Sequence, residues 1–393
     1  MSNARWQAVP LYVGGLMGPF GTTVILPMFP ELRESFDASS SAVGLGFTIY
    51  LVPFAALLLV SGTLGERWGR RRTVRTAYLV YAAASVAAAL APTLEVFLAG
   101  RIVQGAANAF ITPLLVAGLA EITPPERFGR AVGIYSSFQA LGGVMAPIVG
   151  GITADIDWRW AFAGTAVVAL GLALAPPVGE PRTDVAAPRL RPLVNRRMLA
   201  LGAAAFAAAA GPIGISVVVG VVARDELGVS GTAAGAILVS GALSAMVTGP
   251  IWGRLLDRWG TRRAGIVAAT GAAVLVAVMG AADQPVSLAV TWALAGAFVG
   301  FVVVVLQTTA ATSAPDNRGG ALSFMLSFRF VGHGIGPVVW IPVIAWSAPA
   351  AFLASAALGL ITLGVLATLP PVPGGAEVEE PAGAALPSRG PDR

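Results

Sequence analysis

The sequence contains no cysteine and no lysine, and all 25 of its basic residues are arginines. The lack of cysteine excludes disulfide bonds, thiolate metal sites and cysteine nucleophiles. The lack of lysine excludes a Gly-x-x-x-x-Gly-Lys phosphate-binding loop, so ATP hydrolysis by that route is excluded as well. A single histidine argues against a zinc site. We therefore expect no metal, no cofactor and no enzymatic activity.

Charged residues are also scarce. They make up 11% of the 393 residues, whereas hydrophobic residues make up 56%, and the mean hydropathy of +0.78 lies outside the usual range for soluble globular proteins. Apolar runs of about 20 residues, the length of a helix that crosses the hydrocarbon core, follow one another with short polar gaps. The composition predicts a membrane protein whose net charge of +5 favours contact with an anionic lipid bilayer and not with nucleic acid.

The apolar runs predict an all-α protein with twelve transmembrane helices. We place these spans at residues 8–30, 43–63, 76–92, 95–120, 130–154, 160–177, 198–222, 232–253, 263–281, 286–312, 320–345 and 349–369. The first run lacks a small-residue cleavage site, so we expect it to be retained. An even number of spans puts both termini on the same side of the membrane.

Arginine is distributed unequally over the two sides. The termini and the loops on their side hold twenty arginines, whereas the opposite loops hold only Arg33, Arg159 and Arg224 beside nine acidic residues. Cytoplasmic loops of membrane proteins are enriched in positive residues. We therefore predict a multi-pass protein of the inner or plasma membrane with both termini in the cytoplasm.

One stretch of the arginine-rich side occurs twice. Residues 62–72 (GTLGERWGRRR) match residues 253–263 (GRLLDRWGTRR) at seven of eleven positions, 191 residues further along the chain. Each copy is a short hinge between two apolar runs, so the duplication predicts two pseudo-symmetric six-helix bundles. We place the bundles at 1–177 and 198–369, a cytoplasmic linker at 178–197 and a disordered cytoplasmic tail at 370–393.

The hinge residues indicate a conformational latch, meaning a contact that holds the two halves in one orientation. Glu66 needs a cation or a helix N-terminus beside its charge, and the second copy places Asp257 at the same position. A cytoplasmic loop can also collect arginines for topology alone, but two copies in register favour the latch. The candidate latch residues are Gly62, Glu66, Arg67, Gly69, Arg71, Arg130, Asp257 and Arg258.

Four segments resemble signatures of the major facilitator superfamily. Residues 62–72 resemble its loop 2–3 signature, and residues 257–263 resemble the weaker copy in loop 8–9. Residues 101–105 (RIVQG) resemble its helix 4 signature, and residues 142–151 (GGVMAPIVGG) are similar to the helix 5 signature of its drug:proton antiporter branch. The resemblance covers residues 8–369 and implies two six-helix bundles around a central cavity that opens alternately to each side.

Three features depart from these signatures. The acid of the loop 2–3 signature is usually Asp and is Glu66 here, and the residue before the Pro of the antiporter signature is Ala146 in place of Gly. The first span also lacks the acidic residue that many drug:proton antiporters carry there. The position of proton coupling is therefore left open by the resemblance.

Polar residues follow one face of the fourth span, where Arg101, Gln104 and Asn108 are spaced i, i+3 and i+7. An Arg near the membrane centre costs about 3 kcal/mol on insertion scales, so we expect it to face a wet cavity or a partner. The resemblance associates the Arg at this position with proton coupling. The alternative is a hydrogen-bond network that only holds the bundle together.

A second stripe lies on the eleventh span, where Arg329 and His333 are one turn apart, and Gln139 is the fifth-span equivalent of Arg329. A cation beside a histidine can bind an anionic group, and histidine can exchange a proton near neutral pH; a lone histidine can also be a packing residue. The small residues and prolines of both spans are most simply close-packing and hinge positions. They are Gly142, Ala146, Pro147, Gly150, Gly151, Gly332, Gly336 and Pro337.

No Asp or Glu lies in the middle of a span, so Arg101 and Arg329 predict a positive cavity that favours neutral or anionic substrates. We predict a monomeric secondary transporter that exports small amphipathic compounds in exchange for protons. The alternative is a facilitator or symporter that takes up an organic anion or a sugar-like metabolite. An intramembrane enzyme built on His333 and a nearby serine is disfavoured, because no third group orients the base.

Overall fold

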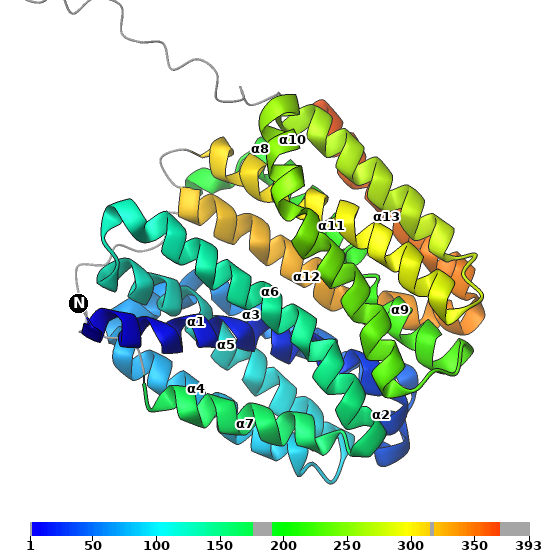
Figure 1. Ribbon diagram of the computed structural model, residues 1–393, viewed down its shortest axis with the longest axis horizontal. Helices are drawn as coiled ribbons and strands as arrows, with labels where there is room; N and C mark the ends of the chain where they lie inside the picture. The colour runs from blue at the N-terminus through cyan, green and yellow to red at the C-terminus, as the bar shows by residue number, and fades with distance from the viewer. Residues whose placement is uncertain (1, 176–190, 315–317, 370–393) are drawn as a thin grey trace, which may run out of the picture.

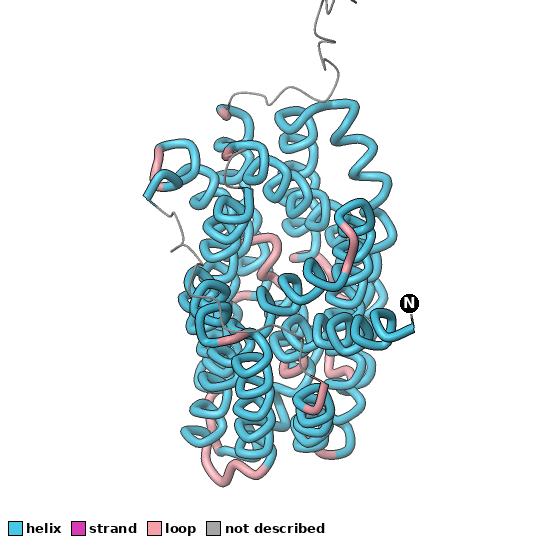
Figure 2. Tube along the Cα trace, turned by 90° about the vertical axis from the view of Figure 1, so that its left-hand side faces the viewer, coloured by secondary structure: helices cyan, strands magenta, loops and turns pink. Residues whose placement is uncertain are grey.

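The computed structural model describes residues 2–175, 191–314 and 318–369. Within these ranges the chain is almost wholly helical and contains no strand (Figures 1 and 2). Most of the linker predicted at 178–197 and all of the tail predicted at 370–393 lie outside the described residues.

All twelve predicted spans correspond to helices. The first half contains α1 (Ser2–Thr23), η1 (Leu26–Met28), α2 (Phe29–Phe36), α3 (Ser40–Trp68), α4 (Arg70–Ala89), α5 (Leu94–Ile122), α6 (Pro125–Ile156) and α7 (Arg159–Ala173). The second half contains η2 (Arg191–Leu193), α8 (Arg196–Ala210), α9 (Ser216–Val221), η3 (Val222–Glu226), α10 (Gly231–Met279), α11 (Pro285–Ser313), α12 (Arg318–Trp346) and α13 (Ala348–Thr368). In the described part of the chain, eight helices are long and apolar enough to cross a membrane, which identifies an all-α, multi-pass membrane protein.

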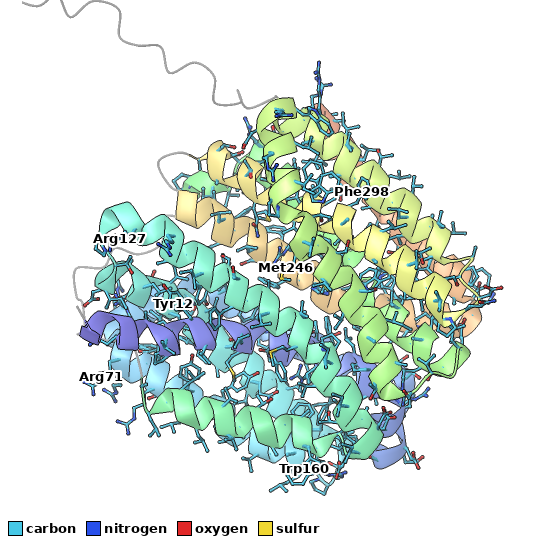
Figure 3. All side chains as sticks on the ribbon, in the orientation of Figure 1. Tyr12, Arg71, Arg127, Trp160, Met246 and Phe298 are labelled. Carbon is cyan, nitrogen blue, oxygen red and sulfur yellow. The ribbon has the colours of Figure 1, made fainter. Side chains whose placement is uncertain are left out.

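The two groups of helices lie side by side, with α1 to α7 in the lower part of Figure 1 and α8 to α13 in the upper part. They meet mainly where α3 packs on α12 and where α6 packs on α10. Arg71 and Arg127 lie at one end of the helices and Trp160 at the other (Figure 3). We call the end that carries both hinges the arginine-rich end, and the opposite end the acidic end.

The first helix of each half is interrupted, whereas the sequence predicted continuous spans at 8–30 and 198–222. The first span ends at Thr23 and continues as the short elements η1 and α2. The seventh is divided into α8 and α9 by residues 211–215, which begin with Gly211 and Pro212. Proline removes a backbone donor and its ring clashes with the preceding turn, so the helix stops before it.

Each hinge contains a glycine with a positive φ at the equivalent position. Gly69, between α3 and α4, has φ 90°, and Gly260, 191 residues later, has φ 71° and kinks α10 into its eighth-span and ninth-span segments. Glycine adopts positive φ without the steric cost that other residues incur. The sequence repeat is therefore also a repeat of local structure.

The same duplication determines how helices pack within each half. A Cβ atom on Gly142 of α6 would lie 2.4 Å from the carbonyl oxygen of Leu16 in α1, and one on Gly332 of α12 would lie 2.4 Å from that of Phe206 in α8. Both glycines and both contacted residues are 190 positions apart. Each half thus brings its fifth helix against the backbone of its first helix through a glycine at the equivalent place.

Candidate functional site

Two ion pairs join the halves at the acidic end. Arg33 of α2 donates from Nη1 to Oδ2 of Asp225 at 3.0 Å and from Nη2 to Oδ1 at 2.9 Å, which is a bidentate pair with η3 of the other half. Arg224 of η3 donates in turn to Oε1 of Glu31 in α2. Each half therefore contributes one arginine and one carboxylate.

A third contact between the halves is a helix cap. Asp155, near the end of α6, accepts hydrogen bonds from the backbone N–H groups of Gly231 at 2.7 Å and Thr232 at 2.8 Å, and from Oγ1 of Thr232 at 2.6 Å. These N–H groups are the first of α10, which have no partner within their own helix. The carboxylate of one half thus caps and faces the positive end of a helix from the other half.

Beside this cap, α6 and α10 touch backbone to backbone. A Cβ on Gly151 would lie 2.3 Å from the carbonyl oxygen of Gly231, and a Cβ on Gly235 would lie 2.2 Å from that of Pro147. Gly151 and Pro147 therefore lie at the seam between the halves. Gly150 instead faces the first half, where its Cβ position is 2.2 Å from the carbonyl oxygen of Val24, the residue after α1. On α12, the side chain of Pro337 lies against Gly44 of α3, where a Cβ would be 3.3 Å from the Pro337 Cβ.

In the sequence, the residues of these acidic-end contacts are recognisable only as loop charges. One signal could have identified two of them. Arg33 and Arg224 are separated by 191 residues, the same spacing as the two hinges. Two of the three arginines in the acidic loops are therefore equivalent positions of the duplicated halves.

A cavity of about 140 Å³ lies between the halves, bordered by α1, η1, α6, α9, α10 and α11. It reaches the seam, because Pro147 and Leu238 belong to its lining. The polar side chains in its lining are the hydroxyl groups of Thr23 and Ser216 and the indole of Trp292, and no charged side chain of the described residues lines it. Arg101 and Arg329 are not in the lining of this cavity, so a positive cavity around them stays a prediction.

Arg101 lies inside the first half with 0% exposure. Its Nε donates to the carbonyl oxygen of Gly46 at 3.0 Å, Nη1 to Oε1 of Gln104 at 2.8 Å and Nη2 to the carbonyl oxygen of Gly21 at 2.7 Å. Gln104 then donates to Oγ of Ser85 at 2.8 Å. Every guanidinium nitrogen is engaged, and the network ties α1, α3, α4 and α5 together.

Asn108 and Gln139 do not join this network. Asn108 is 1% exposed, its amide lies against Gly18 of α1, and its Oδ1 has no hydrogen-bond partner among the described residues. Gln139 of α6 is half-buried. The fourth-span face predicted from the sequence is thus a buried contact face toward α1.

Arg329 and His333 lie on α12 outside the lining of the cavity. The Arg329 guanidinium stacks over the ring of Phe330, with its central carbon 4.9 Å from the ring centre. The His333 ring meets Phe47 of α3 edge to face at 5.1 Å between centres, and its Nε2 is buried without a hydrogen-bond partner in the described chain. His333 therefore sits in the contact between the halves.

At the arginine-rich end the central residue is Arg70, which the predicted latch did not include. Arg70 is 2% exposed and donates to Glu66 through Nε at 2.6 Å and Nη2 at 3.0 Å, and to Glu121 through Nη1 at 2.5 Å. Burial lowers the pKa of the Arg70 guanidinium, but its hydrogen bonds to Glu66 and Glu121 outweigh burial and raise the pKa above its usual value. Glu66 is thus paired within the first half.

The second hinge lacks this arrangement. The position equivalent to Arg70 is Thr261, and Asp257 is exposed and forms no ion pair with the described residues. The remaining candidate latch arginines, Arg67, Arg71, Arg130 and Arg258, are all exposed. A latch that joins the two halves through both hinges stays a prediction.

Comparisons with known proteins agree with this architecture. A family model described as Major Facilitator Superfamily matches residues 11–214 and residues 199–389. A solved bacterial homologue of the human lysosomal transporter Spinster, in an inward-facing and unoccupied conformation, superposes with a TM-score of 0.73 at 17% identity, over 92% of this chain and 96% of that chain. At this identity the superposition establishes the fold alone.

Two curated relatives are similar over shorter stretches. The probable actinorhodin transporter of Streptomyces coelicolor is 31% identical over 196 residues, which are 46% of this chain and 34% of that protein. The MFS antiporter QDR3 of Candida albicans is 30% identical over 145 residues, which are 37% of this chain and 21% of that protein. The matched stretches thus span about a fifth and a third of these relatives' own lengths.

Proposed function

Since this chain belongs to the major facilitator superfamily of membrane transporters, we propose that it exports small amphipathic compounds, neutral or anionic, by alternating access driven by the proton gradient. The arginine distribution supports a cytoplasmic arginine-rich end and an acidic end that faces outward. In this arrangement a substrate enters between the halves from the cytoplasm and leaves at the acidic end.

The ion pairs and the helix cap that join the halves at the acidic end are the observation that carries the proposal. The Arg33–Asp225 side chains are 32% and 27% exposed, and an ion pair of that exposure is worth about 0–1 kcal/mol. A helix cap is worth about 0.5–2 kcal/mol. Contacts of this size hold the closed state and can still be broken and remade in each cycle, as two states in exchange require.

Two relatives support the proposal, since one is a probable transporter of actinorhodin and the other is an antiporter. Within this chain, His333 is the candidate for proton exchange, because its Nε2 is buried at the contact between the halves without a partner in the described chain. The carbonyl and amide partners of Arg101 favour a role in holding the first bundle together. The second candidate function is uptake of an organic anion or sugar-like metabolite by a facilitator or symporter.

The test is the accumulation of neutral, anionic and cationic amphipathic compounds in efflux-deficient cells that produce this protein, with and without a protonophore. Export predicts lower accumulation of at least one compound, and the protonophore should restore accumulation to the level of cells without the protein. His333→Ala should shift the pH dependence of export, whereas the same change at the exposed Glu34 should leave it as it is. Raised accumulation, or equilibration that is indifferent to the protonophore, would contradict export and favour the uptake function.

A further inference from the structure

The lining of the cavity between the halves contains no charged side chain of the described residues. All three guanidinium nitrogens of Arg101 donate hydrogen bonds to partners inside the first half. Arg329 stacks on Phe330 and is not part of the lining. At the acidic end, Arg33 and Arg224 are paired with carboxylates of the opposite half. None of these charges is in the cavity lining, so none is placed to bind a charged group there.

The polar groups that do reach the lining are few. The indole Nε1 of Trp292 donates to the carbonyl oxygen of Leu238 at 3.1 Å, so its N–H is used and its aromatic carbons are what the ring can offer to an occupant. The Thr23 hydroxyl donates to the carbonyl oxygen of Pro19 at 3.1 Å. Besides these groups, the lining offers the hydroxyl of Ser216 and apolar carbon atoms.

Glycines create the space. Gly241 and Gly296 let α10 and α11 approach until a Cβ on Gly296 would lie 2.2 Å from the Gly241 carbonyl oxygen, which fixes one wall. On the opposite wall, a Cβ on Gly143 of α6 would have a single neighbour within 4 Å, a carbon of Pro19 at 3.8 Å. Gly143 therefore borders open volume, and a side chain added there would extend into the cavity.

We propose that this cavity binds an uncharged, apolar group of about the size of one aromatic ring, which is the part of the substrate that anchors it between the halves. An apolar cavity of roughly 150 Å³ is large enough to hold benzene. A charged group would lose its hydration without gaining an opposite charge, and burial of an unpaired charge is strongly unfavourable. The charged or polar part of an amphipathic substrate must then remain outside this cavity.

This inference rests on the proposed transport function for its biological meaning, but the binding test does not need transport. The probes are N-phenyl-1-naphthylamine, which is neutral, and 8-anilino-1-naphthalenesulfonate, which carries a sulfonate on the same ring scaffold. Binding is followed by energy transfer from the tryptophans of the protein in lipid nanodiscs, with the signal of protein-free nanodiscs subtracted. We expect the neutral probe to bind about tenfold more tightly than the sulfonate.

The variant Gly143→Leu fills the cavity and should weaken binding of the neutral probe about tenfold or more, and Gly143→Ala should weaken it less. The matched control is Gly133→Leu on the same helix, since a Cβ at Gly133 has no neighbour within 4 Å and the residue is not in the cavity lining. Thermal unfolding of all three variants reports whether they fold as the parent does.

Equal binding of the two probes, or unchanged binding of the neutral probe by a folded Gly143→Leu, would overturn the inference. Either result together with gradient-driven export of the compound panel would leave the proposed function standing and remove only the cavity assignment. If Gly143→Leu is the only variant that loses binding of the neutral probe, and the parent protein exports none of the compounds, the cavity assignment stands and the proposed function fails.

Discussion

Arg101 and Arg70 are both almost inaccessible cations, and their partners differ in kind. Arg101 faces two backbone carbonyl groups and an amide, whereas Arg70 faces the carboxylates of Glu66 and Glu121. Removal of Arg101 would leave neutral acceptors without a donor. Removal of one acid beside Arg70 would leave a nearly buried cation with half of its compensation, so the two sites predict different consequences.

For the hinge site we predict that Glu66→Ala lowers transport without removing the protein from the membrane. The variant lacks the two hydrogen bonds that Arg70 donates to Glu66, and a hydrogen bond to a charged group is worth about 1.5–3 kcal/mol. The hinge between α3 and α4 therefore loses its fixed geometry. Initial transport rates normalised to membrane protein measure the effect. The control is Glu34→Ala, which changes an exposed acid of α2. Full transport activity of Glu66→Ala would contradict a role of Glu66 in the hinge.

For the buried network we predict that Arg101→Lys destabilises the protein. A lysine ammonium cannot reproduce the planar fork that reaches α1, α3 and Gln104 together, so at least one acceptor is left buried and unpaired at a cost of about 1–3 kcal/mol. Thermal unfolding in detergent should show a lower midpoint than the parent. Arg75→Lys, at an exposed position of α4, should unfold like the parent; identical midpoints for both variants would contradict a clamping role of Arg101.

At the residue scale, the sequence predicts contacts between partners that are close in the chain. The spacing of Arg101 and Gln104 predicted one helix face, and the two side chains are bonded. The pairs Arg70–Glu121 and Arg33–Asp225 were not predicted, because their members lie 51 and 192 residues apart. Contacts of that span depend on the relative placement of helices, which a single sequence does not specify.

At the scale of elements, α10 depends on the other half for hydrogen-bond acceptors to its first backbone N–H groups. Ser230 caps Ala233 from within the chain, but Gly231 and Thr232 are capped by Asp155 of α6. Separation of the halves at the acidic end therefore exposes a helix terminus as well as breaking ion pairs. The cap links the state of one helix to the closure of the molecule.

We predict that Asp155→Asn favours opening at the acidic end, because a neutral amide loses the interaction with the helix dipole and one acceptor oxygen. A loss of about 1 kcal/mol corresponds to about a fivefold change in the equilibrium. The absence of native cysteine allows Ser216→Cys in the cavity lining as the sole reporter. Its labelling by an impermeant maleimide from the acidic-end side should accelerate about fivefold.

Asp157→Asn is the matched control for this experiment, because Asp157 lies two residues further on and pairs with Arg159 of its own half at 3.7 Å. It should leave the labelling rate unchanged. Equal rates in the parent and the Asp155→Asn protein would show that the cap does not hold the acidic end closed.

The sequence predicted the existence and order of the helices well, because runs of apolar residues determine where a chain can cross a bilayer. It did not predict the interruptions of the first and seventh helices. Gly211 and Pro212 lie within an apolar run, and such a run predicts one continuous transmembrane helix even when it contains a proline. Proline is tolerated in transmembrane helices when neighbouring groups form hydrogen bonds with the backbone groups that lose their partner. The break at residues 211–215 borders the cavity, where Ile213 contributes to the lining.

At the scale of the whole molecule, the two halves are related by the duplication but are not equal. Hinge glycines, packing glycines and the arginines Arg33 and Arg224 all recur at a spacing of 190 or 191 residues. The ion pairs of Arg70 occur in the first half, and its counterpart in the second half is Thr261. The acidic end is therefore where both halves contribute equivalent arginines to one interface.

This symmetry allows a test in which both halves are changed together. Arg33→Asp places an acid against Asp225, and Asp225→Arg places a second cation against Arg33, so each single change brings like charges together and should lower transport several-fold. The combined change restores an opposite pair across the interface, and for exposed pairs we expect a coupling of about 0.2–1 kcal/mol. Transport by the double variant should therefore recover toward that of the parent, measured as initial rates at equal membrane levels. If the double variant is as impaired as the sum of the two single variants, the pair does not couple the halves, and closure at the acidic end must depend on Asp155 and the glycine seam of α6 and α10.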